Sequence, residues 1–445
     1  MTTVPTPVRM PLLTGDLNAD AGVIREQAAW DDARLAGLPA KPERTAADQE
    51  AVSELHRSSR RLRSRFMAEH TPAVFAELTQ AGNCRPRIAE LAAAAAERFP
   101  GLVPTADQLA AERRHLQAHK EAREIDQAIF FHHLLGTPTV GQHIVEAMLR
   151  PTPRALALLP EFEHSGVLEL DTVLLERDGD IGRVTLRNTS CLNAEDDQLT
   201  VDLETAVDLV LLDDGIRAGL LRGTTMTHPR YAGRRVFSAG INLKHLYQGS
   251  ISYVDFLLGR ELGYLSKIIR GLRMPDDPDA VTLTTSWEKP WVAAVDTFAI
   301  GGGMQLLLAC DRVVAGTDAY FALPAAQEGI VPGAANLRLG RLVGARLARD
   351  IILDGRKLRA TDPQAKLICD ETVDPEAVGR AADRAAERMT APAVVANRHM
   401  LNLADEPVDR FLCYLSEFAL VQADRLYSQD VLAKIGARWS SGAGR

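Results

Sequence analysis

The chain has 445 residues, more than a usual single domain, so we expect one catalytic domain and a substantial further segment. Hydrophobic residues make up 46% of the chain and charged residues 25%, which is ordinary for a globular protein. The net charge of −8 gives no electrostatic reason to expect nucleic acid or an anionic membrane as a partner.

The N-terminal stretch and the cysteines bear on where the protein works. Residues 1–16 contain prolines but no apolar stretch of signal-peptide length, and no later stretch is long enough to span a membrane. The five cysteines lie far apart, are odd in number and lack CxxC spacing, which is typical of reduced thiols. We therefore expect a cytoplasmic protein.

Residues 1–168 are predicted to form an all-helical domain. Apolar residues at helical spacing predict one helix over residues 107–135, and the alanine-rich residues 92–97 predict another. His115 and His119 are four residues apart in the first of these helices, a spacing that can bind a metal. No third ligand follows and basic residues flank the pair, so we interpret it as a solvated helix face and predict no metal site.

Residues 169–390 change to alternating strand and helix patterns, which are typical of a layered α/β sheet. Two strands, at residues 172–177 and 181–186, flank Asp178-Gly179-Asp180 and predict a hairpin. The other expected elements are helices over 198–212 and from about 302, and strands over 218–222, 291–296 and 312–315. Residues 391–445 are expected to form a C-terminal helical region.

Two short segments, residues 237–243 and 299–305, are the candidates for chemistry. The second contains Gly301-Gly302-Gly303 between a predicted strand and a predicted helix. The N-terminus of a helix leaves backbone N–H groups unpaired, and such groups bind an oxyanion. A glycine triplet alone equally permits a tight turn, so the binding interpretation depends on the first segment supplying a partner strand end.

Further motifs surround the glycine triplet in a fixed order. Residues 289–295 lead into it, and Cys310-Asp311, residues 321–324 and residues 329–333 follow. In this order and spacing, the motifs resemble the crotonase (enoyl-CoA hydratase/isomerase) superfamily over about residues 172–390. The expected fold class is therefore α/β, with a crotonase-like ββα spiral core between the N-terminal all-helical domain and the C-terminal helices.

The resemblance also implies an oxyanion hole that holds a thioester as its enolate. Its two donors are the backbone N–H groups of Ile241 and Gly302. Where the hydratases of the superfamily carry two catalytic glutamates, this chain has Gln305 and Ala325. An amide orients a ligand by hydrogen bonding but does not transfer a proton at neutral pH, so the machinery for adding water is missing.

Three additions are not typical of the hydratases: the helical N-terminal segment and the extra residues within 222–236 and 244–287. Together with the missing glutamates, they resemble the cofactor-independent dioxygenases of the superfamily. Those enzymes convert an arylacetyl-CoA and O2 into an arylglyoxylate and CoA, and the implied aryl group is dihydroxyphenyl. The resemblance implies a CoA thioester and O2 as substrates, no metal or organic cofactor, and a homo-oligomer, either a trimer or a dimer of trimers.

The resemblance assigns roles to individual residues. The implied catalytic residues are Ile241, Gly302, Gln305, Arg260 and Glu195, the last two at the dihydroxyphenyl ring. Ten positions are assigned to substrate binding: Arg187, Thr189, His228, Arg230, Tyr231, Ala239, Gly240, Asn242, Leu243 and Lys244. Three apolar positions are assigned to an O2 pocket: Ala325, Ile330 and Leu243. Ordinary core packing is the alternative for the last three.

Two rival functions stay open on the sequence. One is a hydratase, isomerase or thioester hydrolase on the same fold, acting without O2. The other is a non-catalytic subunit that binds CoA thioesters and uses the helical segment as an interaction module. Loss of both glutamates argues against a hydratase but fits the non-catalytic subunit equally well, whereas the retained oxyanion motif favours the dioxygenase.

Overall fold

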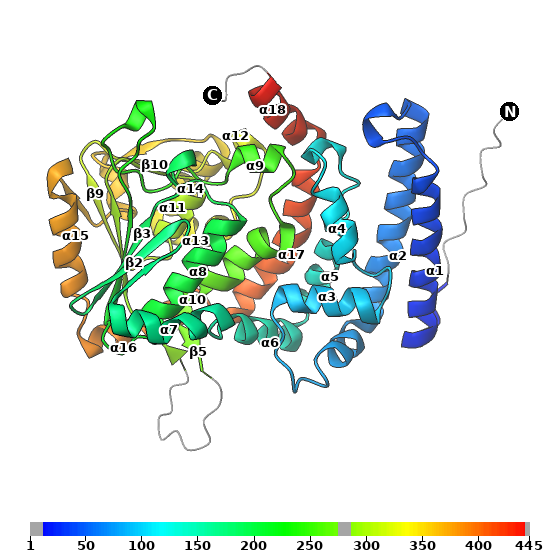
Figure 1. The fold of residues 1–445 in the computed structure, drawn as a ribbon, viewed down its shortest axis with the longest axis horizontal. Coiled ribbons are helices and arrows are strands. Elements are labelled where there is room, and N and C mark those ends of the chain that lie inside the picture. Colours follow the sequence, from blue (N-terminus) through cyan, green and yellow to red (C-terminus); the bar gives the residue numbers. More distant parts are fainter. Residues whose placement is uncertain (1–11, 275–285, 441–445) are drawn as a thin grey trace.

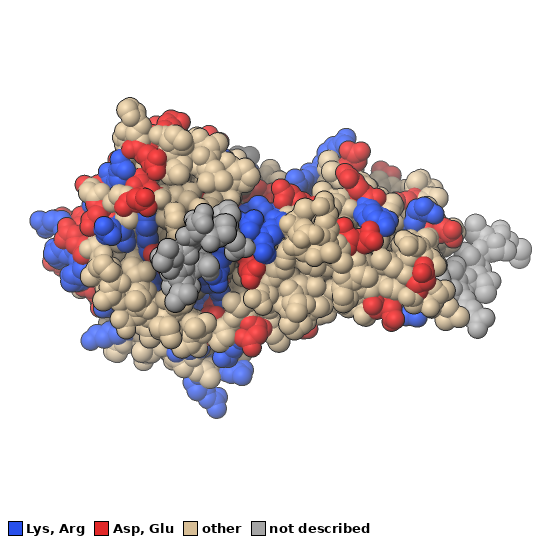
Figure 2. Space-filling view, turned by 90° about the horizontal axis from the view of Figure 1, so that it is seen from below, with Lys and Arg blue, Asp and Glu red and all other residues tan. Residues whose placement is uncertain are grey.

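The computed structural model describes residues 12–274 and 286–440. Residues 1–11, most of the stretch examined for a targeting signal, lie outside the described residues. Within the described ranges, no helix is long and apolar enough to cross a membrane. The molecule is elongated, with a wider body that carries the sheet and a narrower end made of the N-terminal helices (Figures 1 and 2). Basic and acidic residues are interspersed on the face shown in Figure 2.

The N-terminal part is helical, as predicted. Its helices are α1 (Leu17–Ala36), α2 (Ala46–Leu78), α3 (Ile88–Arg98), α4 (Ala106–Glu112), α5 (Glu124–Gly136), α6 (Pro138–Met148) and α7 (Pro153–Ser165), with 3-10 turns η1 (Lys41–Glu43) and η2 (Gln117–His119). The alanine-rich segment lies in α3, which confirms that prediction.

The single helix predicted over residues 107–135 is wrong, because α4 ends at Glu112 and α5 begins at Glu124. The Glu112 carboxylate accepts hydrogen bonds from the backbone N–H groups of Glu121, at 2.6 Å, and Arg123, at 3.1 Å. These bonds replace the helical partners of the two groups, so the chain turns instead of continuing the helix. As a result His115 and His119 do not share a helix face.

The central sheet of the described residues has seven strands in the order β1-β2-β3-β4-β7-β9-β12. Their bounds are β1 (Val167–Glu169), β2 (Val173–Asp178), β3 (Ile181–Leu186), β4 (Ala218–Gly223), β7 (Trp291–Val295), β9 (Arg312–Gly316) and β12 (Glu371–Val373). The predicted hairpin is confirmed as the antiparallel pair β2 and β3. From β3 to β12 all neighbours are parallel, so connecting helices cover both faces.

Alternation along β7 shows how the sheet is buried on both sides. Trp291, Ala293 and Val295 belong to the core on the side of α8 (Asp197–Leu212), whereas Val292 and Ala294 pack toward α15 (Val378–Glu387). Every residue of β7 is buried. This explains why the strand is a continuous apolar run in the sequence.

Smaller elements connect the central sheet to the candidate site. A second sheet has the order β11-β10-β8 and a third pairs β5 with β6. The strands are β5 (Leu272–Arg273), β6 (Ser286–Trp287), β8 (Phe298–Ile300), β10 (Tyr320–Ala322) and β11 (Leu358–Arg359). The helices are α9 (Leu243–Tyr247), α11 (Gly302–Leu307), α12 (Ala325–Glu328), α13 (Ala335–Val343) and α14 (Ala345–Leu353). Short turns are η3 (Thr189–Cys191), η4 (Pro229–Tyr231), η7 (Pro363–Leu367) and η8 (Pro375–Ala377).

Residues 244–274, the described first part of the extra segment within 244–287, are called the insertion below. The insertion and the C-terminal helices add a helical layer between the sheet and the N-terminal helices. The insertion forms two π-helical segments, η5 (Tyr253–Leu258) and η6 (Glu261–Leu265), followed by α10 (Ser266–Arg270). The C-terminal helices are α16 (Pro392–Asp405), α17 (Val408–Leu426) and α18 (Gln429–Ser440). Helix α17 packs along α5 (Figure 1). One hydrophobic core joins all three regions, and its members include Phe66, Phe131, Leu134, Phe256, Leu262, Phe411 and Leu415.

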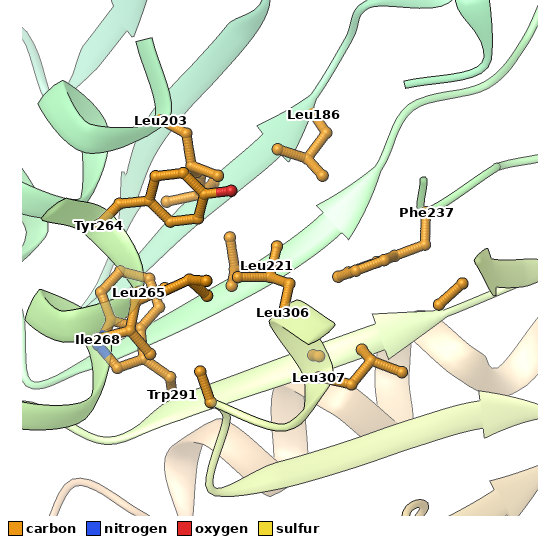
Figure 3. Close-up of a cluster of buried hydrophobic side chains, with 14 of the residues drawn as sticks. Leu186, Leu203, Leu221, Phe237, Tyr264, Leu265, Ile268, Trp291, Leu306 and Leu307 are labelled. Carbon is orange, nitrogen blue, oxygen red and sulfur yellow. The ribbon is translucent and has the colours of Figure 1, made fainter. Parts of the chain in front are cut away.

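A second core lies between α8, the insertion and the central sheet. Figure 3 shows Tyr264 from the insertion beside Leu203 of α8, with Leu221 of β4 and Trp291 of β7 in the same cluster. The insertion therefore contributes to both cores. Because it is fixed on two sides, it can hold charged side chains in place next to the sheet.

Candidate active site

A cavity of about 210 Å³ lies where the helical layer meets the sheet. Its polar lining residues are Glu195, Arg260, Glu261, Gln305, Glu328, Gln422 and Arg438. Its apolar side chains include Ile241, Leu243, Phe256, Leu257, Ile300, Pro324, Ala325, Ile330, Val331 and Phe418. All the predicted catalytic residues and all three predicted O2-pocket residues therefore line one cavity, as do Ala239 and Gly240.

A larger cavity of about 570 Å³ lies elsewhere, between α13 and α16. Arginines and acidic residues line it together with exposed leucines, among them Leu342 and Leu401. Neither residues 237–243 nor residues 299–305 line this cavity, so it lacks the two backbone N–H donors predicted for an oxyanion hole. The smaller cavity is the candidate active site.

Close approach of two chain segments places two backbone donors at the cavity. Ser238 forms a parallel bridge with Ala299, and the Ile300 N–H donates to the Ser238 carbonyl at 3.0 Å. Gly240 has φ +84°, and a Cβ on it would lie 2.9 Å from the carbonyl oxygen of Ile300. Only glycine fits there without displacing the neighbouring strand.

The N–H groups of Ile241 and Gly302 both belong to cavity-lining residues. Gly302 is the first residue of α11, where helix geometry provides no acceptor. Neither N–H has a hydrogen-bond partner among the described residues. The structure therefore brings together two unpaired donors of the kind predicted for an oxyanion hole.

Arg260 is the polar centre of the cavity and is 5% exposed. Its Nη1 donates to Gln305 Oε1 at 2.7 Å and to Glu261 Oε1 at 2.9 Å. Its Nη2 donates to the Gly302 carbonyl at 2.8 Å, and its Nε donates to the Glu195 carboxylate, which Nη2 also faces. The guanidinium therefore has acceptors in every direction, including the backbone carbonyl of Gly302, the residue predicted to supply one oxyanion donor.

The charge states of this cluster follow from burial and pairing. Burial alone would lower the pKa of Arg260, but the charges of Glu195 and Glu261 outweigh it and raise the pKa, so the guanidinium stays protonated. Burial raises the pKa of Tyr264 well above its ordinary value. The phenol therefore stays protonated and donates to Glu195 Oε2 at 3.2 Å.

The insertion positions Arg260 by departing from regular helix geometry. Arg260 lies between the π-helical segments η5 and η6, a kind of distortion that is frequent at functional sites. Gly263 has φ −89° and ψ −113°, outside the helical range. A Cβ on Gly263 would lie 2.9 Å from the Glu204 carboxylate, so the absence of a side chain permits this close packing.

Seven of the predicted substrate-binding residues do not line the cavity: Arg187, Thr189, His228, Arg230, Tyr231, Asn242 and Lys244. Asn242 caps α9 and also donates to Asp196 Oδ2 at 3.3 Å. Arg187 pairs with Glu169. The Tyr231 ring packs against Phe298, in a cluster that also contains the cavity residues Ala239 and Ile300, so η4 lies next to the cavity wall.

Sequence reasoning missed several residues of the site. Glu261, Tyr264 and Gly333 surround the Arg260 cluster, while Phe418 and Gln422 reach the cavity from α17. Gly333 lies in the motif at residues 329–333, but the motif alone gives it no role at the site. The other four lie in no recognisable motif. For Glu261 the signal was its adjacency to Arg260, and an acid next to an arginine is too common to identify a site. Within the described ranges, no three His, Cys, Asp or Glu residues are grouped so that they could hold a metal ion.

Residues 176–411 match the family model described as enoyl-CoA hydratase/isomerase. The chain belongs to the enoyl-CoA hydratase/isomerase family. It is 50% identical over 426 residues to the (3,5-dihydroxyphenyl)acetyl-CoA 1,2-dioxygenase of Amycolatopsis orientalis, covering 96% of this chain and 97% of that protein. It is 28% identical over 231 residues to the short-chain-enoyl-CoA hydratase of Clostridium acetobutylicum, covering 52% of this chain and 79% of the hydratase.

A solved structure agrees on the fold of this enoyl-CoA hydratase/isomerase family member. The crystal structure of an enoyl-CoA hydratase/isomerase from Xanthobacter autotrophicus Py2 has a TM-score of 0.50 and 24% identity, covering 62% of this chain and 95% of that one. The predicted fold class, a crotonase-like α/β core with N-terminal and C-terminal helices, is confirmed. The dioxygenase match covers 96% of this chain and so includes the helical N-terminal part, which lies outside the family-model match at residues 176–411.

Proposed function

We propose that this protein is a (3,5-dihydroxyphenyl)acetyl-CoA 1,2-dioxygenase that converts its thioester and O2 into 3,5-dihydroxyphenylglyoxylate and CoA. One observation carries the proposal: two unpaired backbone donors, Ile241 and Gly302, share a cavity with Gln305 and Ala325, which stand at the two positions where the hydratases carry their catalytic glutamates. The near full-length relative that carries this activity in its name supports the same reading.

The first chemical step is loss of a Cα proton from the thioester. The negative charge that develops on the thioester oxygen is held by the N–H groups of Ile241 and Gly302, and such a donor contributes about 3 kcal/mol to transition-state stabilisation. The aryl group at Cα extends the delocalisation into the ring. The resulting enolate is electron-rich enough to reduce O2 by one electron.

The remaining steps balance without an external reductant. Superoxide and the Cα radical combine to form a C–O bond, and the terminal peroxide oxygen attacks the thioester carbonyl and expels CoA thiolate. Loss of the second Cα proton accompanies cleavage of the O–O bond, which yields the α-keto acid with both oxygen atoms of O2. Every electron comes from the substrate, so the proposed reaction uses no metal or organic cofactor.

The polar end of the cavity suits the dihydroxyphenyl ring of the substrate, and its apolar end suits O2. A phenolic ring hydroxyl can donate to the buried Glu195 carboxylate, and the buried Arg260 guanidinium beside it stabilises negative charge that spreads into the ring. The apolar end, at Leu243, Ala325 and Ile330, favours uncharged O2 over water. We place the CoA portion along η4 and residues 187–189, outside the cavity, and expect a trimer or a dimer of trimers.

Oxygen-electrode measurements with purified, metal-free protein test the proposal. We expect O2 uptake with 3,5-dihydroxyphenylacetyl-CoA, with one arylglyoxylate and one CoA formed for each O2 consumed. Uptake that disappears after exhaustive chelation and returns with one added metal would overturn the cofactor-independent mechanism. Absence of uptake with bound thioester would favour the non-catalytic subunit.

Hydration of crotonyl-CoA separates this proposal from a hydratase. We expect a rate far below 1 per second, an ordinary low value for an enzyme, because Gln305 and Ala325 cannot transfer protons. The measurement is the loss of the enoyl absorbance at matched enzyme concentration, with a hydratase as positive control. A rate of about 1 per second or more would contradict the assignment of the site.

A further inference from the structure

One buried carboxylate on the cavity wall has no part in the mechanism above. Glu261 is 1% exposed and follows Arg260 directly in the chain. Its Oε1 accepts from Arg260 Nη1 at 2.9 Å, and its Oε2 faces Arg338 Nη1 at 3.4 Å. Glu261 thus lies between two guanidinium groups, one inside the cavity and one behind it.

Arg338 is itself fixed from the far side. On α13 it donates through Nε and Nη2 to the Glu406 carboxylate, at 2.9 and 3.1 Å. Glu406 also accepts from Arg270, at the end of the insertion, and from Arg341. A chain of alternating charges therefore runs from Arg260 through Glu261 and Arg338 to the residue that follows α16.

Backbone packing leaves little freedom for the Glu261 carboxylate. Gly333 has φ +46°, and a Cβ on it would lie 2.0 Å from Glu261 Oε1 and 2.5 Å from Gln305 Oε1. The Gly333 backbone therefore lies directly against both acceptors of Arg260 Nη1. Any movement of Glu261 in that direction is blocked, which keeps the pair of acceptors at one separation.

Removing the charge of Glu261 would alter the orientation of Arg260. Arg260 and Arg338 would then face each other without an anion between them, in a buried region where such repulsion is weakly screened. Arg260 Nη1 would keep Gln305 as its charge-free acceptor, while Glu195 would become the sole carboxylate on the guanidinium. Tighter attachment to Arg260 makes Glu195 a poorer acceptor for a substrate hydroxyl.

We propose that Glu261 is a positioning residue: it holds Arg260, and through Arg260 the Glu195 carboxylate, in the orientation needed to recognise the ring hydroxyls of the substrate. The proposal rests on the proposed dioxygenase function. Arg338 and Glu406 anchor Glu261. Because Glu261 is present, Arg260 is hydrogen-bonded to two carboxylates, Glu261 and Glu195, and not to Glu195 alone. Selectivity for a hydroxylated ring is then a property of this buried chain of charges, not of the residues that contact the ring alone.

The test compares kcat/KM for 3,5-dihydroxyphenylacetyl-CoA with kcat/KM for phenylacetyl-CoA, which lacks both hydroxyls. In the parent enzyme we expect a clear preference for the hydroxylated thioester. Glu261→Gln keeps the shape of the side chain and removes its charge, and we expect it to reduce this preference by roughly tenfold, the scale of one hydrogen bond to a charged group. Glu261→Asp keeps the charge and should retain more of the preference than Glu261→Gln.

Glu204→Gln is the matched control. Glu204 is a similarly buried acid that pairs with Lys267 and Arg87 and does not line the cavity. We expect it to lower thermal stability and leave the preference unchanged. Should the preference stay unchanged in Glu261→Gln, or fall equally in Glu204→Gln, the positioning role is overturned.

The outcomes also separate this inference from the proposed function. A parent enzyme that consumes O2 with neither thioester refutes the dioxygenase, whereas a parent that consumes O2 without preference refutes ring recognition by the Arg260 cluster. If Glu261→Gln does not fold, Arg338→Gln decides the question, because it removes the cation that anchors Glu261 from outside the cavity. An unchanged preference in the folded Arg338→Gln variant overturns the proposal.

Discussion

At the scale of single residues, the candidate site depends on side chains that are small or absent. Gly240 and Gly333 allow close backbone approach, and Ala325 leaves space where the hydratases of the family carry an acid. The sequence was sufficient to locate Gln305 and Ala325, because motifs fix their positions. It was not sufficient for Glu261, since its role depends on Arg338, which lies 77 residues away in the chain.

Ala325 provides a test of the O2 pocket. Ala325→Leu adds three heavy atoms to a close-packed apolar end, so we expect O2 to be excluded more than the larger CoA thioester, which is anchored elsewhere. Oxygenation should fall while thioester binding stays near the parent value. The measurement is the O2 dependence of the rate together with the thioester Kd.

Folding has to be checked before these kinetics are interpreted, since overpacking costs about 1–3 kcal/mol. The melting temperature of the variant serves as that control. A folded Ala325→Leu protein with the parent rate and the parent O2 dependence would show that Ala325 is ordinary core and that O2 binds elsewhere.

At the scale of elements, the hydrophobic pattern of the sequence predicted strands and helices correctly where burial of one apolar face determines the local structure. The strands β2, β3, β4, β7 and β9 and helix α8 were predicted from alternation and periodicity. The break between α4 and α5 was missed because the side chain of Glu112 competes with the helix. The π-helical insertion was missed for another reason: its geometry serves contacts of Arg260 and Tyr264 with Glu195, a residue more than sixty positions away.

Lys267 on α10 is expected to hold the insertion against α8. Its ammonium is fully buried and donates to Asp208 Oδ1 at 2.6 Å and pairs with Glu204 Oε1 at 2.8 Å. Lys267→Met leaves Asp208 as a buried carboxylate without its cation, and we expect a loss of about 3–5 kcal/mol in the free energy of unfolding. Urea denaturation measures it, with the exposed Lys244→Met as control. A loss below about 1 kcal/mol would contradict the role of this pair.

Asp197, the first residue of α8, predicts a specific pH dependence. Burial raises its pKa from 3.8 to about 6, although the Ser252 N–H donates to it. Since the folded pKa lies above the unfolded one, the folded state binds the proton more tightly, and the contribution of Asp197 to stability falls as pH rises from about 4 to about 6. Asp197→Asn should therefore gain stability relative to the parent over this range. Urea denaturation at several pH values checks this, and a difference that is constant with pH would contradict it.

At the scale of the whole molecule, the boundaries predicted at residues 168 and 390 mark changes of pattern along the chain, but side chains from all three regions pack together across them. The N-terminal helices, the insertion and α17 share one hydrophobic core. The insertion also contributes to the second core, which lies between α8 and the central sheet. The sequence separates these regions because periodicity is a local property. Which amphipathic faces meet is decided by contacts between distant segments, and no single window of the sequence contains them.

A truncated chain tests this view of the architecture. Deleting residues 12–165 together with the preceding residues removes the partners of large side chains on the insertion and α17, among them Phe256, Leu262, Phe411, Leu415 and Phe418. Exposing five such side chains costs about 8–15 kcal/mol, at 1.5–3 kcal/mol each, which equals the whole stability of a typical domain. We therefore expect the remaining fragment not to fold alone.

Circular dichroism and thermal melting check this, and coexpression of residues 1–168 as a separate chain should restore folding and O2 uptake. A fragment that melts cooperatively near the temperature of the full chain would show that the catalytic core is an independent domain.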